Sequence, residues 1–128
     1  MNVVDSCGWL EFYADGPNAA FFEKPLSDQA SLVVPTICLY EVFKRVLLQR
    51  GERAALEAVA PMQHGMVVEL TSDIALKAAK LSLELKLPMA DSIVLATARE
   101  HDATVWTQDE DFAGVEGVQF RPREEPRR

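Results

Sequence analysis

Short apolar runs alternate with longer amphipathic segments along this chain of 128 residues. The runs have the length of buried strands and contain many valines, which favour extended backbone. They cover residues 2–4, 32–34, 66–70 and 103–106, and a last short edge strand is expected at 118–120. Strands that alternate with helices in this way indicate an α/β fold, in which a parallel sheet carries helices on both faces.

Between the runs, apolar residues recur at the three- and four-residue spacing that places them on one side of a helix. Glycine and proline mark helix ends, as at Gly51 and Pro61, and Thr36 and Thr71 are expected N-caps. Helices are expected at residues 6–14, 37–50, 52–60 and 73–85, around residues 21–22, and from residue 91 onward. A loop is expected at residues 25–28, because this segment begins with proline.

The composition fits ordinary globular protein, since 48% of the residues are hydrophobic and 26% are charged, which excludes a disordered chain. We expect one domain over residues 1–120, followed by a charged, flexible tail over residues 121–128. Cys7 and Cys38 lack the spacing of a metal site, and no signal peptide or membrane-spanning run is visible. We therefore expect a cytoplasmic protein with reduced thiols that does not enter a membrane.

The net charge is −7, from 13 basic and 20 acidic side chains, and this limits how the chain can meet nucleic acid. It argues against a protein that holds nucleic acid mainly through a basic surface, since such affinity comes from neutralising phosphates. It is compatible with an enzyme that meets phosphates through bound cations.

Acidic residues stand at the boundaries between the expected strands and helices. Asp5 follows the first strand and Asp109 lies just past the strand at 103–106, while Asp91 opens a helix. Glu41 is about a turn and a half into the helix that leaves the second strand. Because ligands of such sheets gather beyond the carboxyl ends of the strands, we expect the four acids to meet at one edge.

Carboxylates that are brought together repel one another unless a cation joins them. An all-oxygen site suits Mg²⁺ or Mn²⁺, which polarises a phosphoryl oxygen and activates a water for phosphodiester hydrolysis. Ser6 and Thr107 are placed to orient the ligands from outside the first coordination shell.

The acids lie in four segments, VVDSCGWLE, YEVFKR, MADSIVLATAREH and WTQDEDF, which together resemble the PIN-domain ribonucleases. The resemblance runs through essentially the whole chain and is greatest to the VapC-type toxins of type II toxin–antitoxin pairs. It implies a three-layer α/β/α PIN-like domain with a short, mainly parallel central sheet. It also implies a Mg²⁺- or Mn²⁺-dependent endoribonuclease that leaves 5′-phosphate and 3′-hydroxyl ends on its RNA substrate, has a cognate antitoxin and forms a homodimer.

By this resemblance Asp5, Glu41, Asp91 and Asp109 are both the catalytic residues and the metal ligands, and Asp111 matches a second, more variable acid. Family members often have a serine at the position of Cys7, but the preceding Ser6 is present here. Each aspartate also fits a simpler role as a helix N-cap, and Glu41 alone fits a solvated helix face. The joint placement on one sheet edge favours the metal site. Sequence alone does not decide whether Asp111 is a ligand.

Basic residues follow Glu41 closely. Arg45 lies one turn after it and would hold a carboxylate, bind an RNA phosphate or form a surface ion pair. A patch of Lys44, Arg50 and Arg53 would guide RNA or simply be solvated. The two histidines have no expected catalytic role. The tail arginines are candidate contacts to RNA or a partner, although disorder is the simpler expectation; they are Arg121, Arg123, Arg127 and Arg128.

Five of the ten aromatic residues lie within the first 22 positions, namely Trp9, Phe12, Tyr13, Phe21 and Phe22. One short helix and a short neighbour can hardly bury all of them, so some are expected to line an exposed apolar groove for a partner. The resemblance suggests an antitoxin helix as the occupant. The alternative is that all five belong to the core.

Three other functions fit the sequence less well. A phospho-receiver domain needs a phosphoacceptor aspartate after a central strand and a lysine after a late one, but the third strand ends at Leu70-Thr71 and no lysine follows Trp106. A haloacid dehalogenase-type phosphatase needs Asp-x-Asp, which Asp5-Ser6-Cys7 lacks. A catalytically silent protein-binding module would use only the aromatic groove, and the intact set of four acids argues against it.

Overall fold

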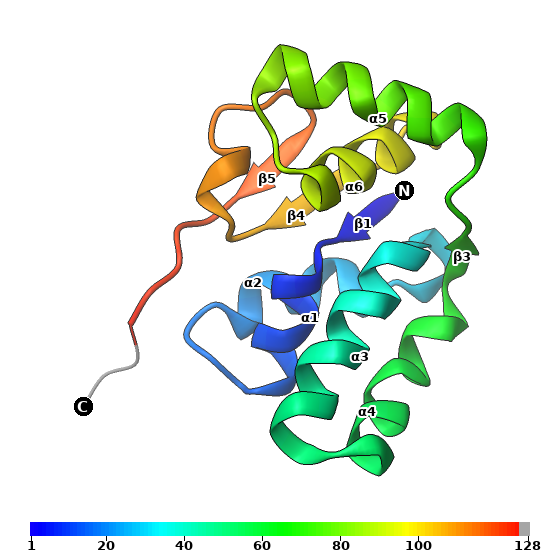
Figure 1. The fold of residues 1–128 in the computed structure, drawn as a ribbon. Helices are drawn as coiled ribbons and strands as arrows, with labels where there is room; N and C mark the ends of the chain where they lie inside the picture. Colours follow the sequence, from blue (N-terminus) through cyan, green and yellow to red (C-terminus); the bar gives the residue numbers. More distant parts are fainter. Residues whose placement is uncertain (126–128) are drawn as a thin grey trace.

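Short parallel strands form the centre of the molecule (Figure 1), as seen in a computed structural model that describes residues 1–125. One sheet has the order β1-β4-β5 and the other pairs β2 with β3. A parallel bridge between Asn2 and Leu32 joins the two sheets. The strands are β1 (Asn2–Val4), β2 (Val33–Pro35), β3 (Met66–Val68), β4 (Thr104–Thr107) and β5 (Val118–Phe120). Every pairing between these strands is parallel, as predicted.

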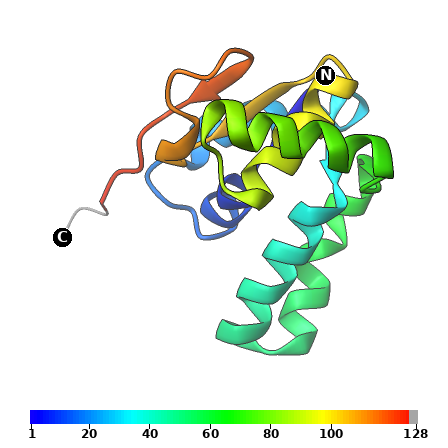
Figure 2. The same ribbon diagram turned by 45° about the horizontal axis from the view of Figure 1, so that its top comes forward.

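Helices cover both faces of the strands, which confirms the α/β/α arrangement. Figure 1 shows α5 (Ser72–Leu85) and α6 (Met89–Glu100) on one side. The other side carries α1 (Ser6–Tyr13), α2 (Ala19–Leu26), α3 (Thr36–Arg50) and α4 (Glu52–Val59). Helices α3 and α4 pack side by side and extend away from the strands as a hairpin (Figure 2). None of the helices within residues 1–125 has the length and apolar character needed to cross a membrane.

The register of β1 against β4 sets the edge at which the acids gather. Val4 pairs with Trp106, and the backbone N–H of Asp5 donates to the Trp106 carbonyl at 3.0 Å. Asp5 therefore leaves β1 at the level where β4 runs into Thr107. This is the carboxyl edge of the sheet, where α/β proteins bind ligands.

The core lies between the strands and the two helical layers. Its fully buried side chains include Val3, Val33, Val105, Phe22 and Phe112. Helix α6 has more buried residues than any other helix within residues 1–125, because all eight residues from 91 to 98 are buried. This enclosure explains the continuous apolar run in the sequence, since a helix that is packed on all sides needs no polar face.

Three helices begin earlier than predicted. Helix α5 starts one residue early, at Ser72 after its expected N-cap Thr71, whereas α3 and α6 each begin directly after a proline. Helix α6 starts at Met89 with Pro88 as its N-cap residue, so Asp91 is its third residue and does not cap it. Helix α3 likewise starts at Thr36 with Pro35 as the N-cap. Both prolines have extended backbone (φ −57° and −63°, ψ 159° and 139°), the conformation that normally precedes a helix. The expected loop at 25–28 was also wrong in part, because Pro25 lies inside the last turn of α2.

The start of the C-terminal tail is held against the domain. The Arg121 backbone N–H donates to the Thr107 carbonyl at 3.1 Å, and Asn18 Nδ2 donates to the Pro122 carbonyl at 2.9 Å. The expected flexibility of the last residues, with Arg127 and Arg128, lies outside the residues that the structure describes.

Candidate metal centre

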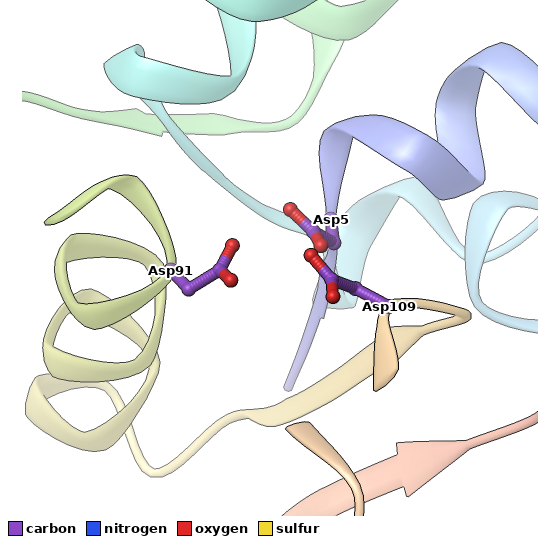
Figure 3. Close-up of side chains that lie close together, drawn as sticks. All are labelled: Asp5, Asp91 and Asp109. Carbon is purple, nitrogen blue, oxygen red and sulfur yellow. The ribbon is translucent and has the colours of Figure 1, made fainter. Parts of the chain in front are cut away.

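Three aspartates from different elements converge at the carboxyl edge of the sheet (Figure 3). Asp5 follows β1, Asp109 follows β4, and Asp91 points toward both from the first turn of α6. One carboxylate oxygen from each lies within 4.8 Å of the others. Asp5 and Asp91 are only 3% and 9% exposed. The geometry therefore brings three of the four predicted acids into one small, largely buried group.

Hydrogen bonds fix the orientation of Asp5. Its Oδ1 accepts from the Ser6 backbone N–H at 2.8 Å, and its Oδ2 accepts from Thr107 Oγ1 at 3.0 Å. The Cys7 thiol lies 3.5 Å from the same Oδ2. Thr107 Oγ1 in turn accepts from the Asp109 backbone N–H at 3.0 Å, so one hydroxyl links two of the acids. Such contacts are typical of the outer shell that positions metal ligands.

The simpler role of helix N-cap applies to two of the three aspartates. Asp5 caps α1 through Ser6, and Asp109 Oδ1 accepts from the Asp111 backbone N–H at 3.0 Å to cap a short 3₁₀ turn, Glu110–Phe112. Asp91 caps nothing, because the N-cap position of α6 belongs to Pro88. Capping thus accounts for a part of the bonding of two acids and for none of Asp91.

Glu41, the fourth predicted acid, lies beside this group rather than inside it. Its Oε1 accepts from Ser6 Oγ at 3.1 Å, and the neighbouring Ser6 N–H binds Asp5. Burial raises the pKa of Glu41, and the nearby charges of Asp5 and Asp109 raise it further. Glu41 is therefore close enough to feel the other carboxylates while α3 holds it at the rim.

Burial is also the main cause that raises the pKa of Asp5 above its usual range. Burial first, and then the charges of Asp5, Asp109 and Asp111, raise the pKa of Asp91 to about 8. Within residues 1–125, no lysine or arginine forms a salt bridge with any of the four acids. The protein does not neutralise the cluster with its own cations in that part of the chain.

The residues present fit a divalent cation. They supply several carboxylate oxygens in a small volume, their repulsion is relieved by a cation, and their orientation is fixed in advance. An oxygen-only set of this kind suits Mg²⁺ or Mn²⁺ rather than a soft metal. Asp111 is exposed, and its charge acts on Asp91, but no contact of its carboxylate assigns it a role as a ligand.

The predicted supporting residue Arg45 and the predicted aromatic groove lie at two different cavities. Arg45 makes no ion pair within residues 1–125, so two of its alternatives were wrong, namely that it holds a carboxylate and that it forms a surface ion pair. It lines a cavity with Ser6 and Glu41. A separate cavity of about 320 Å³ is lined by Trp9, Phe12 and Tyr13, of which the last two are 37% and 39% exposed.

Two of the five aromatic residues do not belong to that groove. Phe22 is fully buried under α1, where a side chain at Gly8 would lie 2.6 Å from its ring. Phe21 packs on Phe22 and on Trp106, with ring centroids 5.0 and 5.1 Å apart. The assignment of these two to an exposed groove is therefore corrected: α2 turns them toward the sheet.

Two buried amides near the site escaped the sequence analysis. Asn18 and Gln108 are almost fully buried, and Asn18 Nδ2 donates to Gln108 Oε1 at 3.0 Å. This bond fixes the residue between Thr107 and Asp109. No local pattern could have revealed it, because the two residues are 90 positions apart.

The sequence matches the family model of the PIN domain over residues 3–118. A search of curated protein sequences found no match. Among solved structures, a toxin–antitoxin complex from Klebsiella pneumoniae is similar with a TM-score of 0.76 and 24% identity, over 93% of this chain and 96% of that chain. The sarcin-ricin loop cleaving toxin VapC20 from Mycobacterium tuberculosis is similar with a TM-score of 0.76 and 20% identity, over 95% of this chain and 100% of that chain.

A DNA-bound VapBC from Salmonella typhimurium is similar with a TM-score of 0.72 and 14% identity, over 95% of this chain and 98% of that chain. At identities below 25%, these three likenesses establish a shared fold. They agree with the family match in extent, since each covers nearly the whole of both chains.

Proposed function

The chain belongs to the PIN domain family, and from this premise we propose that it is a Mg²⁺- or Mn²⁺-dependent endoribonuclease acting as the toxin of a toxin–antitoxin pair. The observation that carries the proposal is the convergence of Asp5, Asp91 and Asp109 within 4.8 Å at the carboxyl edge of the sheet. The structural neighbours lend support, since they include a toxin that cleaves the sarcin-ricin loop and a toxin–antitoxin complex.

In this proposal Asp5, Asp91 and Asp109 hold the cation, and Glu41 completes the ligand set from the side of Ser6. When bound, such an ion polarises a phosphoryl oxygen and lowers the pKa of water, which favours in-line hydrolysis of a phosphodiester. Thr107 keeps Asp5 and the backbone of Asp109 in a fixed relative position. Because the pKa of Asp91 is raised to about 8, its carboxyl group is largely protonated at neutral pH without a cation and would have to lose that proton to serve as a ligand.

The proposed partners follow from the same premise. The cognate antitoxin would lay an apolar segment in the groove of Trp9, Phe12 and Tyr13, and the toxin itself would be a homodimer in the cytoplasm. The products would carry 5′-phosphate and 3′-hydroxyl ends. The receiver-like alternative lacks support, because the family match covers residues 3–118 of this chain.

The deciding experiment compares RNA cleavage by the wild-type chain and by Asp91→Asn in Mg²⁺, in Mn²⁺ and in EDTA. The amide has nearly the size of the carboxylate but carries no charge, so we expect a folded protein that no longer cleaves. Asp28→Asn is the matched control, since Asp28 is exposed and is not among the acids that converge at the site.

Cleavage should be restricted to the samples that contain a divalent ion, and the new 5′ ends should accept a phosphate-dependent ligation. Full cleavage by Asp91→Asn in Mg²⁺ would refute the assignment of the site. The remaining alternative, a catalytically silent PIN domain, predicts no cleavage by the wild-type chain with either metal.

A further inference from the structure

A groove runs along α1 and α3 from the edge of the three-aspartate cluster. It consists of two adjoining cavities of about 440 Å³ and about 300 Å³. Both cavities are lined by Ser6, Leu10, Arg45 and Gln49, so they form one continuous depression. Ser6 binds Asp5 and Glu41, which places the beginning of the groove at the carboxylates.

Basic side chains line this groove although the protein as a whole is acidic. The larger cavity is lined by Lys44 and Arg45, and the smaller one by Arg45 and Arg123. Neither arginine forms a salt bridge within residues 1–125. In a chain with a net charge of −7, two unengaged guanidinium groups beside an acidic cluster mark a local site for an anion.

The acidic side chains of the groove are already engaged inside the protein. Glu11 Oε2 accepts from the Asn18 backbone N–H at 2.8 Å, and Glu41 Oε1 accepts from Ser6 at 3.1 Å. These bonds hold both carboxylates in place, and the cations of the groove, Lys44, Arg45 and Arg123, form no salt bridge within residues 1–125.

Arg123 reaches the groove because the chain just before it is tied down. The Arg121 N–H extends the pairing of β5 with β4, and its guanidinium lies 5.2 Å from the centre of the Phe21 ring. Asn18 then binds the Pro122 carbonyl. The two arginines thus come from unrelated segments, α3 and the tail, and meet at one cavity.

We propose that Arg45 and Arg123 bind the phosphates of an RNA strand next to the phosphodiester that is cleaved. This inference rests on the proposed function and names a substrate-binding subsite for it. Guanidinium groups suit phosphate oxygens because their planar donors bind two oxygens at once. Contacts of this type hold the backbone of any sequence, so they position the strand and leave base selection to other residues.

The test measures binding of a fluorescein-labelled single-stranded RNA by anisotropy, with Asp91→Asn as the background so that the strand stays intact. Arg45→Ala and Arg123→Ala should each weaken binding about tenfold, as expected for the loss of one charge-assisted contact. Each should also lower the slope of log K against log salt concentration by about one. Arg45→Lys should restore the slope, since it keeps the charge.

Lys80→Ala is the matched control. Lys80 is an exposed cation on α5, so this substitution removes one positive charge at another surface. If both arginine variants change affinity and slope no more than this control, the subsite is refuted. Displacement of the RNA by a glutamate-rich peptide as effectively as by unlabelled RNA would also overturn it, because the groove would then be a site for acidic protein.

The result is separable from the fate of the proposed function. Cleavage by the wild-type chain together with unchanged binding by the arginine variants refutes the subsite alone. Absence of cleavage with either metal refutes the nuclease, while the binding series still decides the subsite. Both arginines are exposed, so their replacement should leave the melting temperature unchanged, which circular dichroism checks.

Discussion

The hydroxyl of Thr107 donates a hydrogen bond to Asp5 Oδ2 at 3.0 Å. Thr107 Oγ1 also accepts a hydrogen bond from the backbone N–H of Asp109. A single atom therefore sets the spacing of two acids that follow neighbouring strands. Both bonds are buried or half-buried, which makes the hydroxyl more valuable here than on the surface.

Thr107→Val should therefore weaken metal binding while keeping the shape of the side chain. The valine removes the Thr107 donor from Asp5 Oδ2, while the Ser6 N–H still donates to Oδ1, and it leaves the Asp109 N–H without its acceptor. We expect an affinity for Mn²⁺ that is about 10–100-fold lower, as for other outer-shell changes, and a loss of about 1–3 kcal/mol in stability. Calorimetric titration and thermal unfolding provide the two measurements.

Thr107→Ser should restore most of the affinity, because it keeps the hydroxyl. Thr104→Val on the same strand is the matched control, since no hydrogen bond of the Thr104 side chain is seen within residues 1–125. Equal affinities for Thr107→Val and Thr104→Val would contradict the positioning role.

The metal-free protein should lose stability as the pH rises. The pKa of Asp91 is raised to about 8 in the folded state, against about 3.9 in an unfolded chain. The folded state thus binds more protons than the unfolded state between these values. The contribution of Asp91 is fully present below the lower pKa and is lost as the pH rises through the higher one.

Thermal unfolding in EDTA from about pH 5 to about pH 9 tests this, with the melting temperature falling across the range. Asp91→Asn should flatten that part of the profile, because the amide does not titrate. A wild-type profile that rises toward pH 9 and matches the variant would show that the environment of Asp91 is not the one described.

A divalent cation should stabilise the folded chain by relieving the repulsion among the carboxylates. At a free Mn²⁺ concentration about 100 times Kd, the expected gain is about 2.7 kcal/mol. The gain should be larger at pH 8 than at about pH 5, since the ion competes with protons for Asp91. Melting temperatures with Mn²⁺ and after chelation measure it.

Asp91→Asn and Asp5→Asn should both remove this gain, while the exposed Asp28→Asn should keep it. A stabilisation of equal size in all three variants would mean that the ion binds elsewhere on the acidic surface.

Asn18→Ala should release the segment that carries Arg123. The variant loses the bond to Pro122 and the bond to Gln108, so we expect both lower stability, by about 1–3 kcal/mol, and weaker RNA binding. Two truncations separate these effects. A chain that ends at Arg123 should bind RNA like the full chain, whereas one that ends at Phe120 should bind like Arg123→Ala.

Fluorescence anisotropy with the same labelled RNA compares the three forms. RNA binding that survives removal of residues 121–128 unchanged would show that the tail has no part in the groove.

Much of the site was predictable because its signals are local. An aspartate that directly follows a valine-rich run is placed at the end of a strand by chain geometry alone, and parallel strands end at a common edge. Asp5 and Asp109 could be paired on this basis. Asp91 was expected to open its helix, but Pro88 is the residue that precedes the helix. Asp91 therefore lies inside the first turn and does not cap it.

The rest depends on contacts between distant residues, which leave no local pattern. The packing of Phe22 against Gly8 requires the angle between α1 and α2, which their separate sequences do not encode. The attachment of the tail depends on a bond between Asn18 and a carbonyl 104 positions later. The meeting of Arg45 with Arg123 follows from that bond, and composition alone suggested only a loose, charged end.

The enclosure of α6 has a consequence for how the site moves. A helix whose residues 91–98 are all buried can exchange its amide hydrogens only through a large opening of the domain. Asp91 is therefore carried on a helix that is well anchored in the core. Asp109 stands before a single 3₁₀ turn, of which Glu110 and Asp111 are exposed and Phe112 is buried. In hydrogen–deuterium exchange, cation binding should slow the amides around residues 109–111 far more than those of α6: the helix is preorganised, and the ion acts by ordering the loop against it.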